Sequence, residues 1–316
     1  MTRMLATREA YGRGLVKLAE KYKDFVVLDA DLSAATKTGE FARKYPDRAF
    51  NLGIAEQNMM GFAVGLANTG LVPFAGTFAV FAAGRAYDQI RQSIAYPHSN
   101  VKIVATHGGL TVGEDGATHQ AIEDIAMMRA LPNMVVIVPA DAVETEKALE
   151  AALNYQGPVY LRLGREKMPV IMPENYYFEI GKAVVLKSGQ DLTIIAAGIM
   201  VAKALEAAKK LKELSIDAGV INCHTIKPLD QETILREVEK TGRVITAEEH
   251  SVIGGLGSAV NDLLVREGQN KGIRVVNVGI EDEFGQTGKA DELLQLYKLT
   301  TERLVKEGQK LMGKGG

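Results

Sequence analysis

The sequence predicts an α/β protein made of two consecutive three-layer α/β domains with mainly parallel sheets. Short apolar, β-branched runs alternate with amphipathic helical patterns along the chain, and near-continuous apolar strands are typical of parallel sheets that helices cover on both faces. The alternation is interrupted at residues 166–187, which carry two prolines and no helical period. A chain of 316 residues is also long enough for two domains.

The first half of the chain alternates strand and helix patterns. Residues 11–22 keep the apolar spacing of one helical face, and Asp141 is a suitable N-cap for a helix over 141–155. We expect a further helix to begin near His119. The predicted strands cover residues 25–30, 71–78, 101–107, 133–140 and 158–164.

The second half repeats this alternation. A helix is predicted over about 200–214 and another after Pro228. The predicted strands cover residues 191–198, 218–225, 243–250 and 273–280. The domain boundaries that follow are 1–170 for the first domain, 171–187 for the linker and 188–316 for the second domain.

Composition excludes several classes of protein. A net charge of −2 and a pI of about 6.3 do not predict a nucleic-acid surface. The single cysteine, Cys223, rules out an internal disulfide and fits a reducing compartment. The N-terminus lacks the apolar core of a signal peptide, and no segment has the roughly 18 uninterrupted apolar residues of a membrane span. We expect a soluble cytoplasmic protein.

Candidate site residues are sought at the carboxyl ends of the strands, where parallel sheets bind ligands. The strand over 101–107 ends at His107 and runs into a glycine-rich loop that contains GEDGATHQ (113–120), with Asp115 and His119. Neither the calcium-loop spacing nor the dinucleotide fingerprint is present. Standing alone, the octet favours a capped loop with surface charges.

Other candidates follow neighbouring strands. Glu56 heads an apolar, glycine-spaced helix, where a routine solvated charge is not expected. Phe78 and Phe81, in GTFAVF, would by default be core aromatics. Arg8 and Arg165, each taken alone, would be surface residues.

Taken together, these residues resemble one family closely. The first half is similar to the pyrimidine-binding domain of thiamine-diphosphate enzymes, and the resemblance to transketolase is the tightest. It spans nearly the whole chain, and the second half resembles the C-terminal domain of the family. The motifs are ATRE (6–9), LDADLS (28–33), LGIAEQNM (52–59), GTFAVF (76–81), THGGLTVGEDGATHQ (106–120), RALPNMVVIVPAD (129–141), LRLGRE (161–166), TIKPLD (225–230) and AEEHSVIGGLGSAV (247–260).

The resemblance implies a role for each residue around the cofactor, thiamine diphosphate. Glu56 would hydrogen-bond the pyrimidine ring nitrogen and so promote the tautomer that takes the proton from the thiazolium carbon. Phe81 would stack on the pyrimidine, Phe78 would line the same pocket, and Asp31 would lie near the cofactor. The cofactor supplies the electron sink, and the protein supplies geometry and electrostatics.

The resemblance also implies a sugar-phosphate site. Asp115 and His119 match residues that contact sugar hydroxyls, and His119 would also move protons on the reacting groups. Arg8, His107 and Arg165 match residues that bind the phosphate, for which guanidinium groups are well suited. The octet would therefore bind a sugar.

Several departures from the family qualify these expectations. Gly84 stands where the family often has a tyrosine, and RAYDQ (85–89) is closer to deoxyxylulose-phosphate synthase. A phosphate-binding serine of many transketolases falls near Ala35 or Thr36. The GDG motif that binds diphosphate and magnesium is absent, so we assign no metal ligand to this chain.

The missing motif leads to a hypothesis about partners. The chain begins where the second domain of a full-length transketolase would begin, and it is predicted to be the C-terminal subunit of a split transketolase. An N-terminal subunit would supply the Mg²⁺ ligands, in a heterotetramer with two copies of each chain. Together they would transfer two-carbon ketol units between sugar phosphates.

Alternatives of other kinds stay open from the sequence. The β subunit of a 2-oxoacid dehydrogenase's decarboxylating component has the same two-domain plan, but it would lack GEDGATHQ and the two arginines. A half-enzyme like deoxyxylulose-phosphate synthase and a non-catalytic scaffold are the others.

GGLGSA (254–259) is interpreted as a helix-start turn, and His224 and His250 as structural residues.

Overall fold

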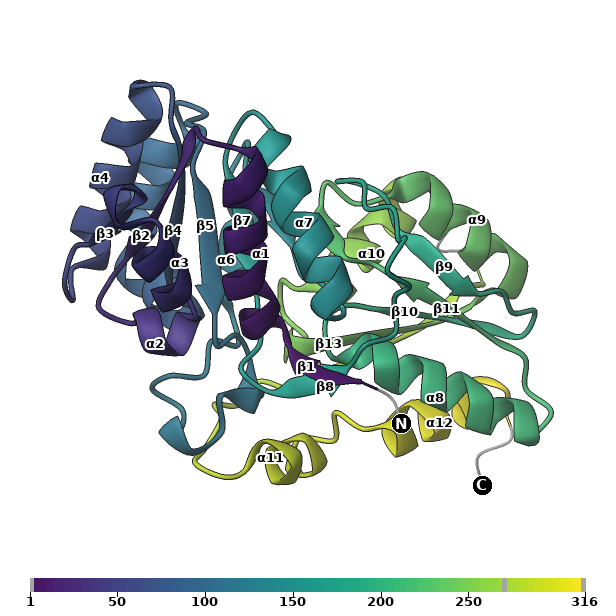
Figure 1. Cartoon of the computed structure of the whole chain (residues 1–316). Helices are drawn as coiled ribbons and strands as arrows, with labels where there is room; N and C mark the ends of the chain where they lie inside the picture. Colours follow the sequence, from purple (N-terminus) through teal and green to yellow (C-terminus); the bar gives the residue numbers. More distant parts are fainter. Residues whose placement is uncertain (1–2, 269–271, 314–316) are drawn as a thin grey trace.

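A computed structural model of the chain describes residues 3–268 and 272–313. It contains two α/β units side by side, each with a mostly parallel sheet between helices (Figure 1). The predicted fold class is therefore confirmed. Of the helices within the described residues, none has the length and apolar character needed to cross a membrane.

The first sheet has seven strands in the order β12-β6-β7-β5-β4-β2-β3. All five strands predicted for the first half are present, and β3 is an addition. Neighbours from β6 to β3 run parallel, whereas β12 is antiparallel to β6. The bounds are β2 Phe25–Asp29, β3 Ala49–Asn51, β4 Val72–Phe78, β5 Lys102–Thr106, β6 Val135–Ile137, β7 Val159–Arg162 and β12 Thr225–Lys227.

Helices cover both faces of this sheet because each has one apolar side. Leu15 of α1 (Thr7–Lys21) and Leu149 of α7 (Ala142–Asn154) pack on one face, and Met60 of α4 (Glu56–Asn68) packs on the other. Asp141 accepts a hydrogen bond from the Glu144 amide, as the predicted N-cap should. Shorter helical segments are α2 Ser33–Thr36, α3 Gly39–Lys44, α5 Tyr87–Gln89, α6 Asp124–Ala130, two 3₁₀ turns at Pro46–Arg48 and Leu110–Asp115, and two π-helical segments at Phe81–Arg85 and Ile90–Ala95.

The prediction of a helix that begins near His119 is wrong. His119 lies in a turn whose amide donates to the Gly116 carbonyl, and α6 begins only at Asp124. The physical reason is the neighbouring Gln120, which is buried and donates to the carbonyls of Leu110 and Gln286. These contacts hold the segment against two other loops and prevent a regular helix there.

The second sheet has five strands in the order β14-β13-β10-β11-β9. Helices α8 and α12 pack on one face, and α9 and α10 pack on the other. The apolar core on this second face is continuous with that of the first sheet. The bounds are β9 Val184–Lys187, β10 Leu192–Ala196, β11 Ala218–Asn222, β13 Arg243–Ser251, β14 Arg274–Ile280, α8 Met200–Glu213, α9 Gln231–Thr241, α10 Leu256–Arg266, α11 Ala290–Leu296 and α12 Thr301–Leu311.

The segment read as an irregular linker contains two strands. β8 (Lys167–Pro169) pairs antiparallel with β1 (Met4–Ala6) in a separate two-stranded sheet, and β9 extends the edge of the second sheet. Proline is tolerated at such edges because one side of the strand needs no ladder hydrogen bond. The segment thus contains regular structure. The domain boundaries at residues 170 and 187 stay a prediction.

The predicted strand 218–225 is also divided between the two sheets. β11 ends at Asn222, and residues 225–227 form β12, which pairs with β6 of the first sheet. A segment from the second half of the chain thus completes the edge of the first sheet. The two units are interlocked by backbone hydrogen bonds.

A buried ion pair lies where the two units meet. The Arg162 Nε donates to both carboxylate oxygens of Asp124, at 3.1 and 2.8 Å. Its Nη2 donates to the carbonyls of Ala121 and of Glu249 in the second unit, each at 3.0 Å. The Tyr160 hydroxyl donates to the same Asp124 carboxylate at 2.8 Å.

Asp124→Ala is expected to lower the free energy of unfolding by about 3–5 kcal/mol, because it leaves a buried guanidinium without its counter-charge. Urea unfolding followed by circular dichroism would measure this. Asp262→Ala is the control, since that carboxylate is 70% exposed and 4.0 Å from Arg129; it should cost less than about 1 kcal/mol. Equal losses in the two variants would contradict the assignment.

Candidate active site

Four aromatic side chains meet at the carboxyl ends of β4 and β5. The Phe78 ring stacks on the His107 ring with centroids 3.8 Å apart. Phe81 lies parallel to Phe78, at 5.7 Å and an interplanar angle of 10°, and His119 meets Phe81 edge-on at 5.5 Å. Side chains predicted to bind cofactor and side chains predicted to bind substrate thus form one cluster.

His107 is held by contacts on both ring nitrogens. Its Nδ1 is 2.9 Å from the Thr106 hydroxyl and its Nε2 is 3.3 Å from the Arg8 Nη1. Because Arg8 can only donate, Nε2 is the acceptor in this arrangement and the proton belongs on Nδ1. Burial, with Arg8 and Arg165 nearby, lowers the pKa of His107 to about 3. The imidazole is therefore neutral at pH 7.

Arg8 and Arg165 converge on this histidine from α1 and from the loop after β7. Arg8 donates to the Ala35 carbonyl at 3.0 Å, and burial, followed by the charge of Arg165, lowers the Arg8 pKa. Arg165 contacts the Val112 carbonyl and lies 3.3 Å from the Asp115 carboxylate. The structure therefore places Arg8, His107, Arg165 and Asp115 close together; their roles in binding a sugar phosphate stay a prediction.

The loop that carries Asp115 and His119 is braced by the second unit. The Thr111 amide donates to the buried Glu249 carboxylate at 2.6 Å, and a Cβ at Gly109 would lie 2.3 Å from that carboxyl group. Gly116 has φ 77°, and a Cβ there would lie 2.6 Å from the Thr287 hydroxyl. These glycines allow the two units to approach closely.

Glu56 is the first residue of α4, and its side chain is 1% exposed. The Arg85 Nη1 donates to both of its carboxylate oxygens, at 2.9 and 3.0 Å. The same guanidinium lies over the Phe81 ring, 4.4 Å from the centroid. Glu56 is thus linked to the aromatic cluster through Arg85, which the sequence analysis did not propose as a site residue.

Asp31 lies away from these contacts. It follows β2 with φ 64°, its side chain is exposed, and its carboxylate accepts a hydrogen bond from the Asn51 amide at 3.0 Å. Its contact with the cofactor stays a prediction.

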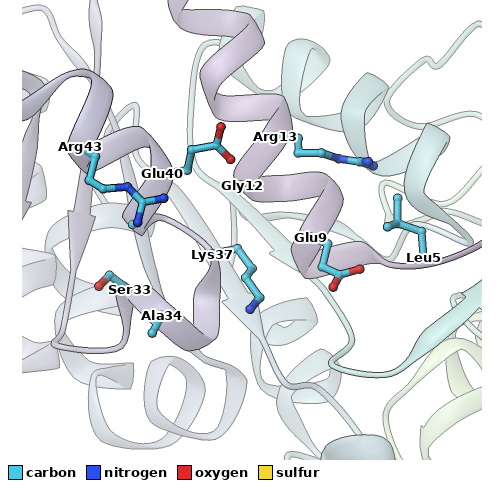
Figure 2. Close-up of a pocket in the computed structure, with 10 residues that line it drawn as sticks. Leu5, Glu9, Gly12, Arg13, Ser33, Ala34, Lys37, Glu40 and Arg43 are labelled. Carbon is cyan, nitrogen blue, oxygen red and sulfur yellow. The ribbon is translucent and has the colours of Figure 1, made fainter.

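A hollow of about 520 Å³ lies between α1 and residues 33–43. Lys37 lies on its wall (Figure 2) and is one of the cations that lower the His107 pKa. A Cβ at Gly12 would lie 2.3 Å from the Lys37 carbonyl oxygen, so this glycine allows the loop to reach α1. The other lining residues are Leu5, Glu9, Arg13, Ser33, Ala34, Gly39, Glu40 and Arg43.

At Ala35 and Thr36, near which the phosphate-binding serine of many transketolases falls, the Thr36 hydroxyl is engaged within the fold. That hydroxyl is buried and donates to the Asp29 carboxylate at 3.1 Å, while Ala35 has no hydroxyl to offer. Lys37 is the nearby polar residue that the sequence analysis missed. Its sequence signal is weak, because a lysine in a loop usually carries only a solvated surface charge.

The remaining candidates have structural surroundings. His224 is buried against Phe178, with ring centroids 4.2 Å apart, and the buried His250 is 3.3 Å from the Ala126 amide. GGLGSA starts helix α10, whose Leu256 amide donates to Glu248. Across the described residues 3–268 and 272–313, no three His, Cys, Asp or Glu side chains gather as a metal site.

Two family descriptions match the chain. Residues 3–170 match "Transketolase, pyrimidine binding domain", and residues 181–304 match "Transketolase, C-terminal domain". Together they account for most of the sequence.

Individual relatives agree with this match. A protein of Methanocaldococcus jannaschii described as a transketolase C-terminal section is 51% identical over 95% of this chain and 94% of its own. Human transketolase is 40% identical over 98% of this chain but only 49% of its own. A solved structure described as "Split gene transketolase, inactive beta4 tetramer" is 52% identical, with a TM-score of 0.91 over 99% of this chain and 100% of that one.

Proposed function

The chain belongs to the transketolase family, and from that premise we propose that it is the C-terminal subunit of a two-chain transketolase. With an N-terminal partner it would transfer a two-carbon ketol unit from a ketose phosphate to an aldose phosphate, using thiamine diphosphate. Two of the proteins described above support the two-chain arrangement: the Methanocaldococcus jannaschii relative, which this chain matches over 94% of its length, and the split-gene transketolase structure.

One observation carries this proposal. The parallel rings of Phe78 and Phe81 adjoin the neutral imidazole of His107, beside which lie the two cationic side chains of Arg8 and Arg165. Aromatic faces suit the planar pyrimidine ring of the cofactor, and guanidinium groups suit the phosphate oxygens of a sugar phosphate. The arrangement also disfavours the 2-oxoacid dehydrogenase alternative, which has no use for a sugar-phosphate site.

The cofactor-binding residues fit the pyrimidine half of thiamine diphosphate. When bound, the cofactor supplies a nucleophilic thiazolium carbon and an electron sink. The buried Glu56 would hold and exchange a proton at the pyrimidine ring nitrogen. Phe81 would stack on that ring, and Phe78 would keep water from it. Asp31 is proposed to lie near the cofactor.

Asp115 and His119 are proposed to orient the sugar. Both lie on the braced loop, and the Asp115 carboxylate is 42% exposed, which leaves it able to accept hydrogen bonds from sugar hydroxyls. The Nδ1 of His119 is 3.0 Å from the Thr118 hydroxyl. Its Nε2 would then exchange protons with the reacting hydroxyl and carbonyl groups.

The partner is proposed from the chemistry of the other half of the cofactor. A diphosphate bound through Mg²⁺ needs oxygen ligands, and these would come from an N-terminal subunit that carries the magnesium motif. Two copies of each chain would form the assembled enzyme. A cytoplasmic location stays part of this proposal.

His107→Ala and Arg165→Ala are expected to raise the KM for phosphorylated acceptors about tenfold to a hundredfold. Arg165→Ala removes a charge-assisted hydrogen bond to the phosphate, and His107→Ala removes the acceptor that orients the Arg8 guanidinium. The affinity for thiamine diphosphate should stay close to that of the unmodified enzyme. Steady-state kinetics of the assembled enzyme with phosphorylated and unphosphorylated aldoses would separate the two effects.

Arg3→Ala is the matched control, since Arg3 is 56% exposed and pairs with Glu174 at the surface. Its KM should equal that of the unmodified enzyme. Variants of His107 and Arg165 that lose cofactor affinity and keep a normal KM would show that these residues serve the cofactor instead.

A further inference from the structure

Arg85 makes two contacts on one side of the aromatic cluster. Its guanidinium bridges the Glu56 carboxylate, at 2.9 and 3.0 Å, and the face of Phe81, at 4.4 Å. In the function proposed above, on which this inference rests, the aminopyrimidine ring of the cofactor makes the same pair of contacts. Both groups are planar and both hydrogen-bond the Glu56 carboxyl group, the guanidinium as a donor and the pyrimidine through its ring nitrogen, so they compete for one place.

Local backbone geometry directs Arg85 to this place. Residues 81–85 form a π-helical segment, in which the Ala86 amide donates to the Phe81 carbonyl at 3.2 Å. Such segments are frequent at functional sites. The segment turns the chain so that the Arg85 guanidinium lies over the Phe81 ring.

Burial explains why the place needs an occupant. A carboxylate that is 1% exposed is costly to leave without a partner, and Arg85 supplies the counter-charge. The Arg85 side chain is itself 48% exposed. When it moves away from Glu56 it enters water, so its charge loses no hydration. One partner of this ion pair is buried and the other is half exposed.

We propose that Arg85 occupies the aminopyrimidine place of the separate chain and is displaced from Glu56 and Phe81 when the cofactor binds. Arg85 is thus a further residue of the cofactor site, and it acts by competition. It keeps Glu56 paired before assembly and lowers the affinity of the empty site for the pyrimidine ring.

Thiamine tests this competition in the isolated full-length chain, because it carries the pyrimidine ring without the diphosphate that needs magnesium and a partner. Arg85→Gln keeps a planar hydrogen-bonding group beside Glu56 and removes the charge. Calorimetric titration should show about tenfold or more tighter thiamine binding than the unmodified chain, since one charged hydrogen bond no longer has to be broken. Unchanged or weaker binding would overturn the proposal.

Three further variants separate the possible causes. Arg91→Gln makes the same charge change at an exposed residue of the next π-helical segment, and it should bind thiamine like the unmodified chain. If its thiamine affinity rose as much as that of Arg85→Gln, the loss of charge alone would explain the effect and the competition would be overturned. Arg85→Lys keeps the charge but loses the planar group, so it should also bind more tightly, and it serves if Arg85→Gln does not fold.

Phe81→Ala distinguishes this inference from the proposed function. It should remove thiamine binding if the pyrimidine site is where we place it. If thiamine binds and Phe81→Ala abolishes the binding while the Arg85 variants change nothing, the competition alone is wrong. If thiamine binds none of the chains, or binds Phe81→Ala normally, the pyrimidine site itself is wrong and the competition falls with it.

Discussion

Glu56→Gln is expected to lower the turnover of the assembled enzyme by about a hundredfold to ten-thousandfold, the usual range for loss of a general acid–base group. The amide matches the carboxylate in shape and can still accept a hydrogen bond from Arg85, so the fold should persist. It cannot exchange a proton with the pyrimidine ring, and activation of the cofactor should therefore fail. Single-turnover and steady-state kinetics would measure the loss.

Glu174→Gln is the matched control, because that carboxylate is 81% exposed and pairs with Arg3 at the surface. It should leave turnover unchanged. Circular dichroism would establish that both variants fold. Turnover of Glu56→Gln within a fewfold of the unmodified enzyme would remove Glu56 from the proposed mechanism.

The isolated chain is expected to have no measurable transketolase activity, and addition of an N-terminal subunit that carries the magnesium motif should restore it. The described residues bring together the side chains proposed to bind the pyrimidine and the sugar phosphate, and among them no three His, Cys, Asp or Glu side chains gather as a metal site. A diphosphate with several negative charges would lack its magnesium ligands. Activity measured at increasing partner concentration should rise from zero to a plateau.

The plateau should lie near equal amounts of the two chains if they assemble with two copies of each. Addition of magnesium and thiamine diphosphate without the partner is the control and should give no turnover. Robust activity of the chain by itself under those conditions would overturn the two-chain proposal.

Long apolar strands were predictable because each carries its own periodic signal. Residues 25–30 and 71–78 correspond closely to β2 and β4. Three-residue strands such as β3 and β12 carry too few residues for such a signal, and nothing local indicates which sheet β12 will join. That choice depends on which sheet edge is free in the folded chain, and hence on tertiary structure.

The residues of the candidate site could also be predicted only in part. Glu56, Phe78, Phe81, His107 and the two arginines could be proposed because they lie in motifs that resemble a known family. Arg85 and Lys37 could not, since each depends on backbone geometry. Arg85 needs the π-helical segment, and Lys37 needs a positive φ of 71° together with the space at Gly12.

The pairing of β12 with β6 has a consequence for how this protein could be divided by evolution or by the experimenter. A gene that ended within residues 171–187 would encode a first sheet whose β6 edge had lost its neighbour. Such an exposed row of backbone donors and acceptors is a template for adhesion between molecules. A second gene that began there would encode a stray strand with no sheet to join. A division within residues 171–187 would therefore leave unpaired backbone groups on both products.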